Sequence, residues 1–135
     1  METFIERPEN ISNNHLNIVI FDMIIISKSM CINDISTLAN LKFSVGSREV
    51  NESAVWRYRV ASMDKSKLDG EMYRSLYEKL TQEFTWLKHF SKGEVLFDVQ
   101  LRHSSYTASL RLPSYLVELL GDFRAAVVFS AYPTN

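Results

Sequence analysis

Runs of apolar residues divide the chain into stretches with the period of a strand and stretches with the period of a helix. Leu16–Ser27 is almost continuously apolar and rich in β-branched residues, which is typical of a strand buried on both faces. Ala54–Ala61 alternates apolar and polar side chains, as a half-buried strand does. Glu94–His103 and Tyr106–Leu112 are expected to form a hairpin, and Arg124–Tyr132 is a last strand, again apolar on both faces.

Three other stretches carry apolar positions at helical spacing. Asn33 is the expected N-cap of a short helix that runs to Leu41, because its side chain can accept an unpaired backbone N–H of the first turn. A long helix is expected over Leu68–Phe90, and Pro113 suits the first turn of a third helix, Ser114–Leu120. This order of elements predicts an α+β fold: a two-layer sandwich with a mixed, mainly antiparallel sheet of about five or six strands, one long helix and two short ones.

Composition indicates one domain with a real core. The chain has 135 residues, 46% of them hydrophobic, with four Gly and three Pro, which argues against disorder. Residues 1–14 are polar, contain Pro8 and are expected to be a mobile lead-in, followed by a single domain over residues 15–135. The net charge of −1 gives no electrostatic reason to expect nucleic acid or a membrane surface as a partner. No secretory signal or membrane-spanning run is recognised, so a cytoplasmic location is expected.

Residues that could carry catalysis are scattered along the chain. Cys31 is the single cysteine, and His15, His89 and His103 fall in different predicted elements without the spacing of metal ligands. No phosphate-binding loop, hydrolase motif or zinc motif is present. Asp22 is unusual, because a carboxylate within an apolar strand is either an acid tuned by burial or the partner of an arginine. We therefore expect a protein that is not an enzyme, with no catalytic residue, no metal and no cofactor.

The sequence favours a binding surface over a catalytic site. Polar side chains share one parity of three predicted strands, while the opposite parity is apolar, so one face of the sheet is dry and the other bears arginines. Arginine matches carboxylate or phosphate groups and is enriched at protein interfaces. The alternative is an ordinary solvated sheet face. The candidate partner-binding residues are Arg57, Arg59, Asp98, Gln100, Arg102, Ser109 and Arg111. Charge reversal at these arginines is expected to weaken binding and leave folding intact.

Two segments in the last third of the chain carry a resemblance to a known family. Ser109–Gly121 followed by Ala126–Tyr132 resembles the end of a family of small bacterial proteins catalogued as domain of unknown function 4279. Upstream, Ile35–Leu41 is similar to the first helix of that family, and Trp56 stands where its second strand tends to have a Trp. The resemblance covers about Leu16 to Pro133 as short apolar motifs. The chain lacks the Pro-Thr and Lys-Gly that often follow the first helix.

The resemblance implies an α+β sandwich without established catalytic residues. Similar small domains recur as immunity proteins beside polymorphic toxins, including those of contact-dependent inhibition. It therefore points to a protein partner, the C-terminal domain of a cognate toxin, which the immunity protein would occlude. Two alternatives stay open: a small enzyme or ligand-binding domain that uses Asp22, His103 and the arginines, and a structural dimer that buries apolar surface or pairs an edge strand. A monomer or weak dimer is expected.

Overall fold

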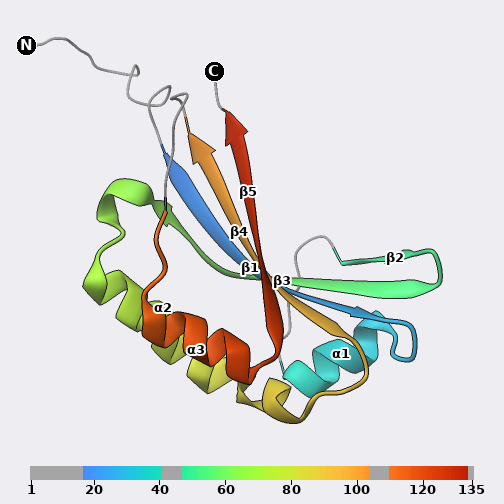
Figure 1. Ribbon diagram of the computed structural model, residues 1–135. Helices are drawn as coiled ribbons and strands as arrows, with labels where there is room; N and C mark the ends of the chain where they lie inside the picture. Colours follow the sequence, from blue (N-terminus) through green and yellow to red (C-terminus); the bar gives the residue numbers. More distant parts are fainter. Residues whose placement is uncertain (1–16, 41–46, 104–109, 134–135) are drawn as a thin grey trace, which may run out of the picture.

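One mixed sheet forms the first layer of the protein. The computed structural model describes residues 17–40, 47–103 and 110–133. Its strands are β1 (Ile18–Ser27), β2 (Arg48–Val50), β3 (Ser53–Asp64), β4 (Glu94–His103) and β5 (Ala125–Pro133), and they lie in the order β2-β3-β1-β4-β5 (Figure 1). Neighbouring strands are antiparallel except β4 and β5, which are parallel. The predicted α+β class with a mixed, mainly antiparallel sheet is thereby confirmed.

Helices form the second layer, and all three lie on one side of the sheet (Figure 1). They comprise the long α2 (Gly70–Phe84) and the short α1 (Ile32–Ala39) and α3 (Ser114–Asp122), with 3₁₀ turns η2 (Lys65–Lys67) and η3 (Thr85–His89). Asp69 caps α2 by accepting the backbone N–H of Met72 at 2.9 Å. No helix among the described residues is long and apolar enough to cross a membrane.

The start of α1 differs from the prediction. Asn33 lies inside the helix, and the N-cap position is Cys31, whose side chain makes no capping hydrogen bond. Ile32 packs against the core, which places the first turn of the helix one residue before Asn33. Local cap chemistry is worth about 1 kcal/mol, so packing of an apolar residue can override it.

The predicted hairpin is wrong in its second half. β4 pairs with β1 and β5, and residues 110–112 form no strand; the rest of the predicted second strand, residues 106–109, lies outside the described residues. The chain returns through α3, so β5 runs parallel to β4, as a crossover connection requires. Among the described strands, β5 lies at the edge of the sheet, although apolar residues on both faces are typical of a central strand.

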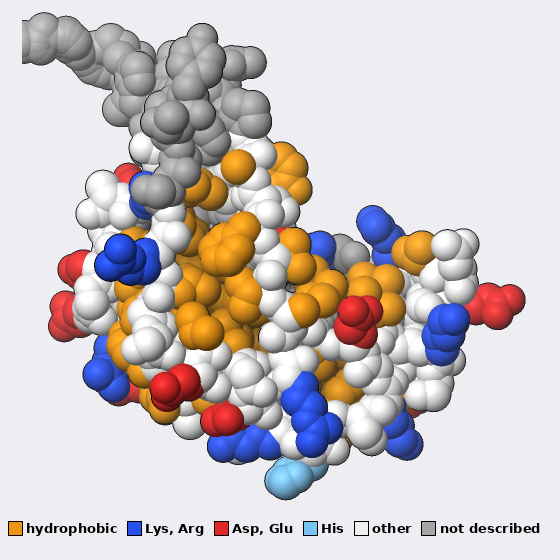
Figure 2. Space-filling view, in the orientation of Figure 1, with side chains coloured by type: hydrophobic (Ala, Val, Ile, Leu, Met, Phe, Trp, Pro, Cys, Tyr) orange, Lys and Arg blue, Asp and Glu red, His pale blue; other side chains and the backbone are white. Residues whose placement is uncertain are grey.

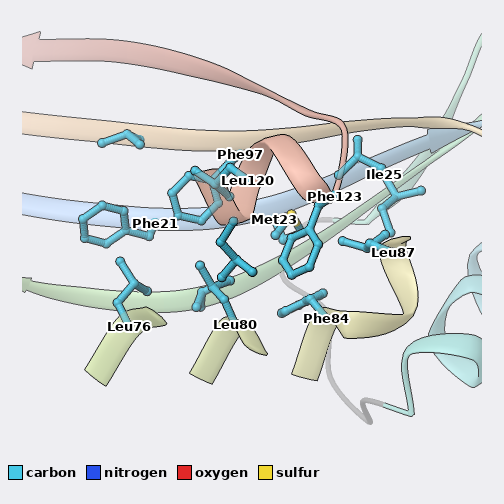
Figure 3. Packing of buried hydrophobic residues seen from close by; sticks show 14 of the residues in the cluster. Phe21, Met23, Ile25, Leu76, Leu80, Phe84, Leu87, Phe97, Leu120 and Phe123 are labelled. Carbon is cyan, nitrogen blue, oxygen red and sulfur yellow. The ribbon is translucent and has the colours of Figure 1, made fainter. Parts of the chain in front are cut away.

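The core lies between the sheet and the helices. Phe21, Met23 and Ile25 of β1 point toward Leu80 and Phe84 of α2 (Figure 3), and all five side chains are fully buried. Their alternate spacing in β1 and their spacing of four in α2 place them on the facing surfaces of the two elements. Large apolar side chains on both sides explain why the two layers pack as one unit.

Candidate functional site

A bulge in β3 decides which side chains reach the face of the sheet that points away from the helices, called here the open face. Phe21 pairs with Ala61, but Asp22 pairs with Arg59, so Val60 is an additional residue in β3. If β3 continued in the register of the Phe21–Ala61 pair, Asp22 would lie opposite Val60. Arg59 would then turn toward the helices, because a shift of one residue exchanges the two faces. The bulge therefore brings the arginines of β3 to the carboxylate of β1.

Lys79 of α2 holds the bulge from the helical layer. Its Nζ donates a hydrogen bond of 2.8 Å to the backbone carbonyl of Val60 and lies 5.9 Å from the centre of the Tyr58 ring. The carbonyl accepts from a charged donor, and the ammonium group also gains a weak cation–π contact. Helix and open face are thus linked through one residue of the bulge.

Replacement of Lys79 by methionine is expected to lower the free energy of unfolding by about 1–2 kcal/mol, because the Val60 carbonyl loses a charged hydrogen-bond donor while the aliphatic stem is kept. The measurement is urea denaturation followed by circular dichroism. Lys88→Met is the matched control, since Lys88 is exposed on η3. Equal losses in the two variants would contradict a specific role for the bulge contact.

Asp22 lies at the centre of the open face and is fully buried. Arg57 Nη1 donates to its Oδ2 at 2.8 Å. Arg59 donates from Nε to Oδ1 at 3.1 Å and from Nη2 to Oδ2 at 3.4 Å, a two-point contact. A carboxylate without access to water is stable only when its charge is paired and its oxygens accept hydrogen bonds, and both conditions are met here.

Asp98 faces Asp22 directly across β1 and β4. Its Oδ2 accepts hydrogen bonds from Arg57 Nη1 at 3.2 Å and from Gln100 Nε2 at 2.9 Å. Its Oδ1 is buried and has no hydrogen-bond partner among the described residues. Arg57 therefore bridges two carboxylates that would otherwise repel each other, and we call Asp22, Arg57, Arg59, Asp98 and Gln100 the arginine–aspartate cluster.

The charge state of Arg57 is set by opposing effects. Partial burial disfavours its charged form, but hydrogen bonds and Coulomb attraction from Asp22 and Asp98 outweigh this, so the pKa of the guanidinium is raised above its usual value. Arg57 is therefore charged throughout the pH range in which proteins are folded. Two cations and two anions make the cluster neutral as a whole.

Both arginine side chains remain partly accessible. The side chain of Arg57 is 28% exposed and that of Arg59 is 38% exposed, although guanidinium nitrogens of both are bound to Asp22. Because the carboxylate holds these nitrogens, both side chains have fixed orientations. Such preorganised groups lose little conformational entropy when a partner binds.

The structure brings together four of the seven candidate residues, Arg57, Arg59, Asp98 and Gln100. Arg102 is exposed toward the end of β4. Arg111 lies apart from the cluster, in a groove lined by Val117 of α3 and by Val127 and Phe129 of β5, so the four arginines do not form one patch. Ser109 lies outside the described residues.

The described residues that were weighed for catalysis do not converge on Asp22. Cys31 is exposed at the start of α1, and His89 is exposed at the end of η3. His15 and the side chain of His103 lie outside what the structure describes. The hydrogen-bond partners of Asp22 are arginines, so its geometry is that of a buried ion pair rather than of an acid beside a histidine.

An apolar surface at the β5 edge was not predicted. Val117, Val128, Phe129 and Tyr132 are exposed, with Phe129 at 58% and Tyr132 at 49%. Hydrophobic side chains gather in the middle of the molecular surface at β5 and α3 (Figure 2). The sequence signal was present, since β5 is apolar on both faces, but the same pattern is typical of a central strand.

Comparison with known proteins adds no further information. The chain matches no protein family, no curated protein and no solved structure.

Proposed function

We propose that this protein is a binding protein that occludes a cognate bacterial toxin domain and so protects the producing cell, without catalysing a reaction itself. The observation that carries the proposal is the arginine–aspartate cluster, which fixes two partly exposed arginine side chains on a face that no described helix covers. The resemblance to small proteins found beside polymorphic toxins supplies the kind of partner.

The cluster has the properties that a protein interface needs. Guanidinium groups match carboxylates in geometry and are enriched at interfaces. Because Asp22 already holds them, a partner does not have to order them. A stable inhibitory complex typically covers about 1,200–2,000 Å² in total, so neighbouring exposed residues such as Arg102 would belong to the same surface. The partner would present acidic groups there.

The test is binding to the C-terminal toxin domain encoded beside this gene. Arg102→Glu is expected to weaken the complex about tenfold, mainly through slower association, because reversal of an exposed interface charge removes electrostatic steering. Lys88→Glu makes the same change of charge on the helical layer and is expected to leave affinity unchanged. Surface plasmon resonance measures both rates. Absence of a complex with the wild-type protein, or equal losses in the two variants, would refute the proposal.

One observation favours a ligand-binding role, although at a groove whose described lining includes neither Asp22 nor the arginines expected to form such a site. A groove of about 360 Å³ lies between α1 and η3 and is lined by Leu38, Trp86 and Phe90, among others. Its volume is at the lower end of the range for small-molecule pockets. None of the five residues of the cluster lines it. The two functions therefore place the binding surface at different sites. A small molecule that binds the wild-type protein but not Trp86→Ala would indicate the ligand-binding function.

A further inference from the structure

We propose that β5 pairs with β5 of a second copy of this chain, antiparallel and with Phe129 at the two-fold axis, so that one continuous sheet runs through the dimer. The inference goes beyond the proposed function, since it concerns a different surface and a different partner.

The first observation is the edge itself. Among the described strands β5 pairs only with β4, and the register between them is unbroken over nine residues, without a bulge. No residue from Ala125 to Pro133 is charged. Proteins usually protect a sheet edge with charges, bulges or very short strands, because its free N–H and C=O groups are a template for another strand. β5 has none of these protections over Ala125–Tyr132.

The second observation is the exposed apolar surface on both sides of this edge. Val128 and Tyr132 are exposed on the open face, and Phe129 and Val117 are exposed on the helical side. Figure 2 shows the hydrophobic side chains that gather there. Contiguous apolar surface at one place marks an interaction site more often than scattered apolar residues do.

The sequence of β5 indicates that the strand added at this edge comes from a second copy of the chain. A strand without charge can align with itself without placing like charges opposite each other. With Phe129 at the axis, the two Phe129 side chains lie opposite each other, and every other bulky residue meets a small one: Tyr132 lies opposite Ala126 of the second copy, Val127 opposite Ala131, and Val128 opposite Ser130. Side chains opposite each other in an antiparallel pair share a face, and this register keeps the two open faces on the same side.

A groove on the helical side of β5 can accommodate side chains of the second copy. It has a volume of about 440 Å³ and is lined by residues 110–112, Val117, Val127 and Phe129. Phe129 of the second copy would cover this apolar surface. Five strand spacings would separate the two copies of Asp22, about 24 Å at the usual distance between strands. The dimer would therefore present two arginine–aspartate clusters on one face.

The test is disulfide cross-linking of single-cysteine variants in a Cys31→Ser background, since Cys31 is the only native cysteine and is exposed. Phe129→Cys is expected to form a linked dimer on mild oxidation, because opposite residues of an antiparallel pair lie about 4.5–5.5 Å apart, within disulfide range. Ala126→Cys is the matched control on the same strand. Its counterpart would be six residues away, about 20 Å, and no link is expected.

A second measurement does not depend on replacing Phe129. Sedimentation of the wild-type protein is expected to show a concentration-dependent dimer, and Val128→Lys is expected to raise its dissociation constant at least tenfold without changing the circular dichroism spectrum. A wild-type protein that is monomeric at all concentrations would overturn the proposal. So would equal cross-linking of Ala126→Cys and Phe129→Cys. A monomer that loses affinity for the toxin domain through Val128→Lys would assign the edge to that partner instead.

Discussion

Replacing Arg57 by glutamate is expected to lower the free energy of unfolding by about 3–5 kcal/mol, the cost of removing one partner from a buried ion pair. Asp22 has no access to solvent and would lose its 2.8 Å hydrogen bond. The new carboxylate would lie beside Asp22 and Asp98, which Arg57 now holds together. Repulsion among three carboxylates in this position would add to the loss.

Arg102→Glu separates this effect from a change in net charge. It makes the same charge reversal at an exposed position toward the end of β4, and we expect it to change stability by less than about 0.5 kcal/mol. Urea denaturation of both variants at pH 7 measures the difference. Similar midpoints for the two variants would mean that Asp22 does not depend on Arg57.

This expectation revises one that the sequence suggested, namely that charge reversal at the candidate arginines leaves folding intact. Strand parity correctly predicted that Arg57 and Arg59 share a face, and Asp22 was expected either to be a tuned acid or to pair with an arginine. The structure shows the second. What parity could not show is the bulge at Val60, because a one-residue insertion leaves no mark in the local pattern.

Local signals predicted elements better than their partners. The long helix and the first strand follow directly from the period of their apolar residues. The hairpin prediction rested on a local turn signal, whereas β4 and β5 pair through a crossover that depends on how α3 packs. A Cβ on Gly93 would collide with the backbone carbonyl of Ile26, so glycine is required there by a close approach between distant segments, which no local pattern shows.

The sequence could not show that β5 lies at the edge of the sheet either. An apolar strand such as β5 is typical of the middle of a sheet, and only the topology shows that its outer side is unpaired among the described strands. Two phenylalanines illustrate the difference that topology makes. Phe84 is fully buried, whereas Phe129 is 58% exposed.

Phe84→Ala is expected to lower the free energy of unfolding by about 3–5 kcal/mol, because the cavity cannot close without moving the aromatic rings around it. Phe84 lies 5.8 Å from the Tyr58 ring and 6.5 Å from the Trp56 ring, measured between centroids. Phe129→Ala, measured at a concentration low enough for monomer, is expected to cost less than about 1 kcal/mol. The same substitution should thus destabilise the fold strongly at one site and only slightly at the other. Equal losses in thermal and urea unfolding would show that the edge of the sheet is part of the core.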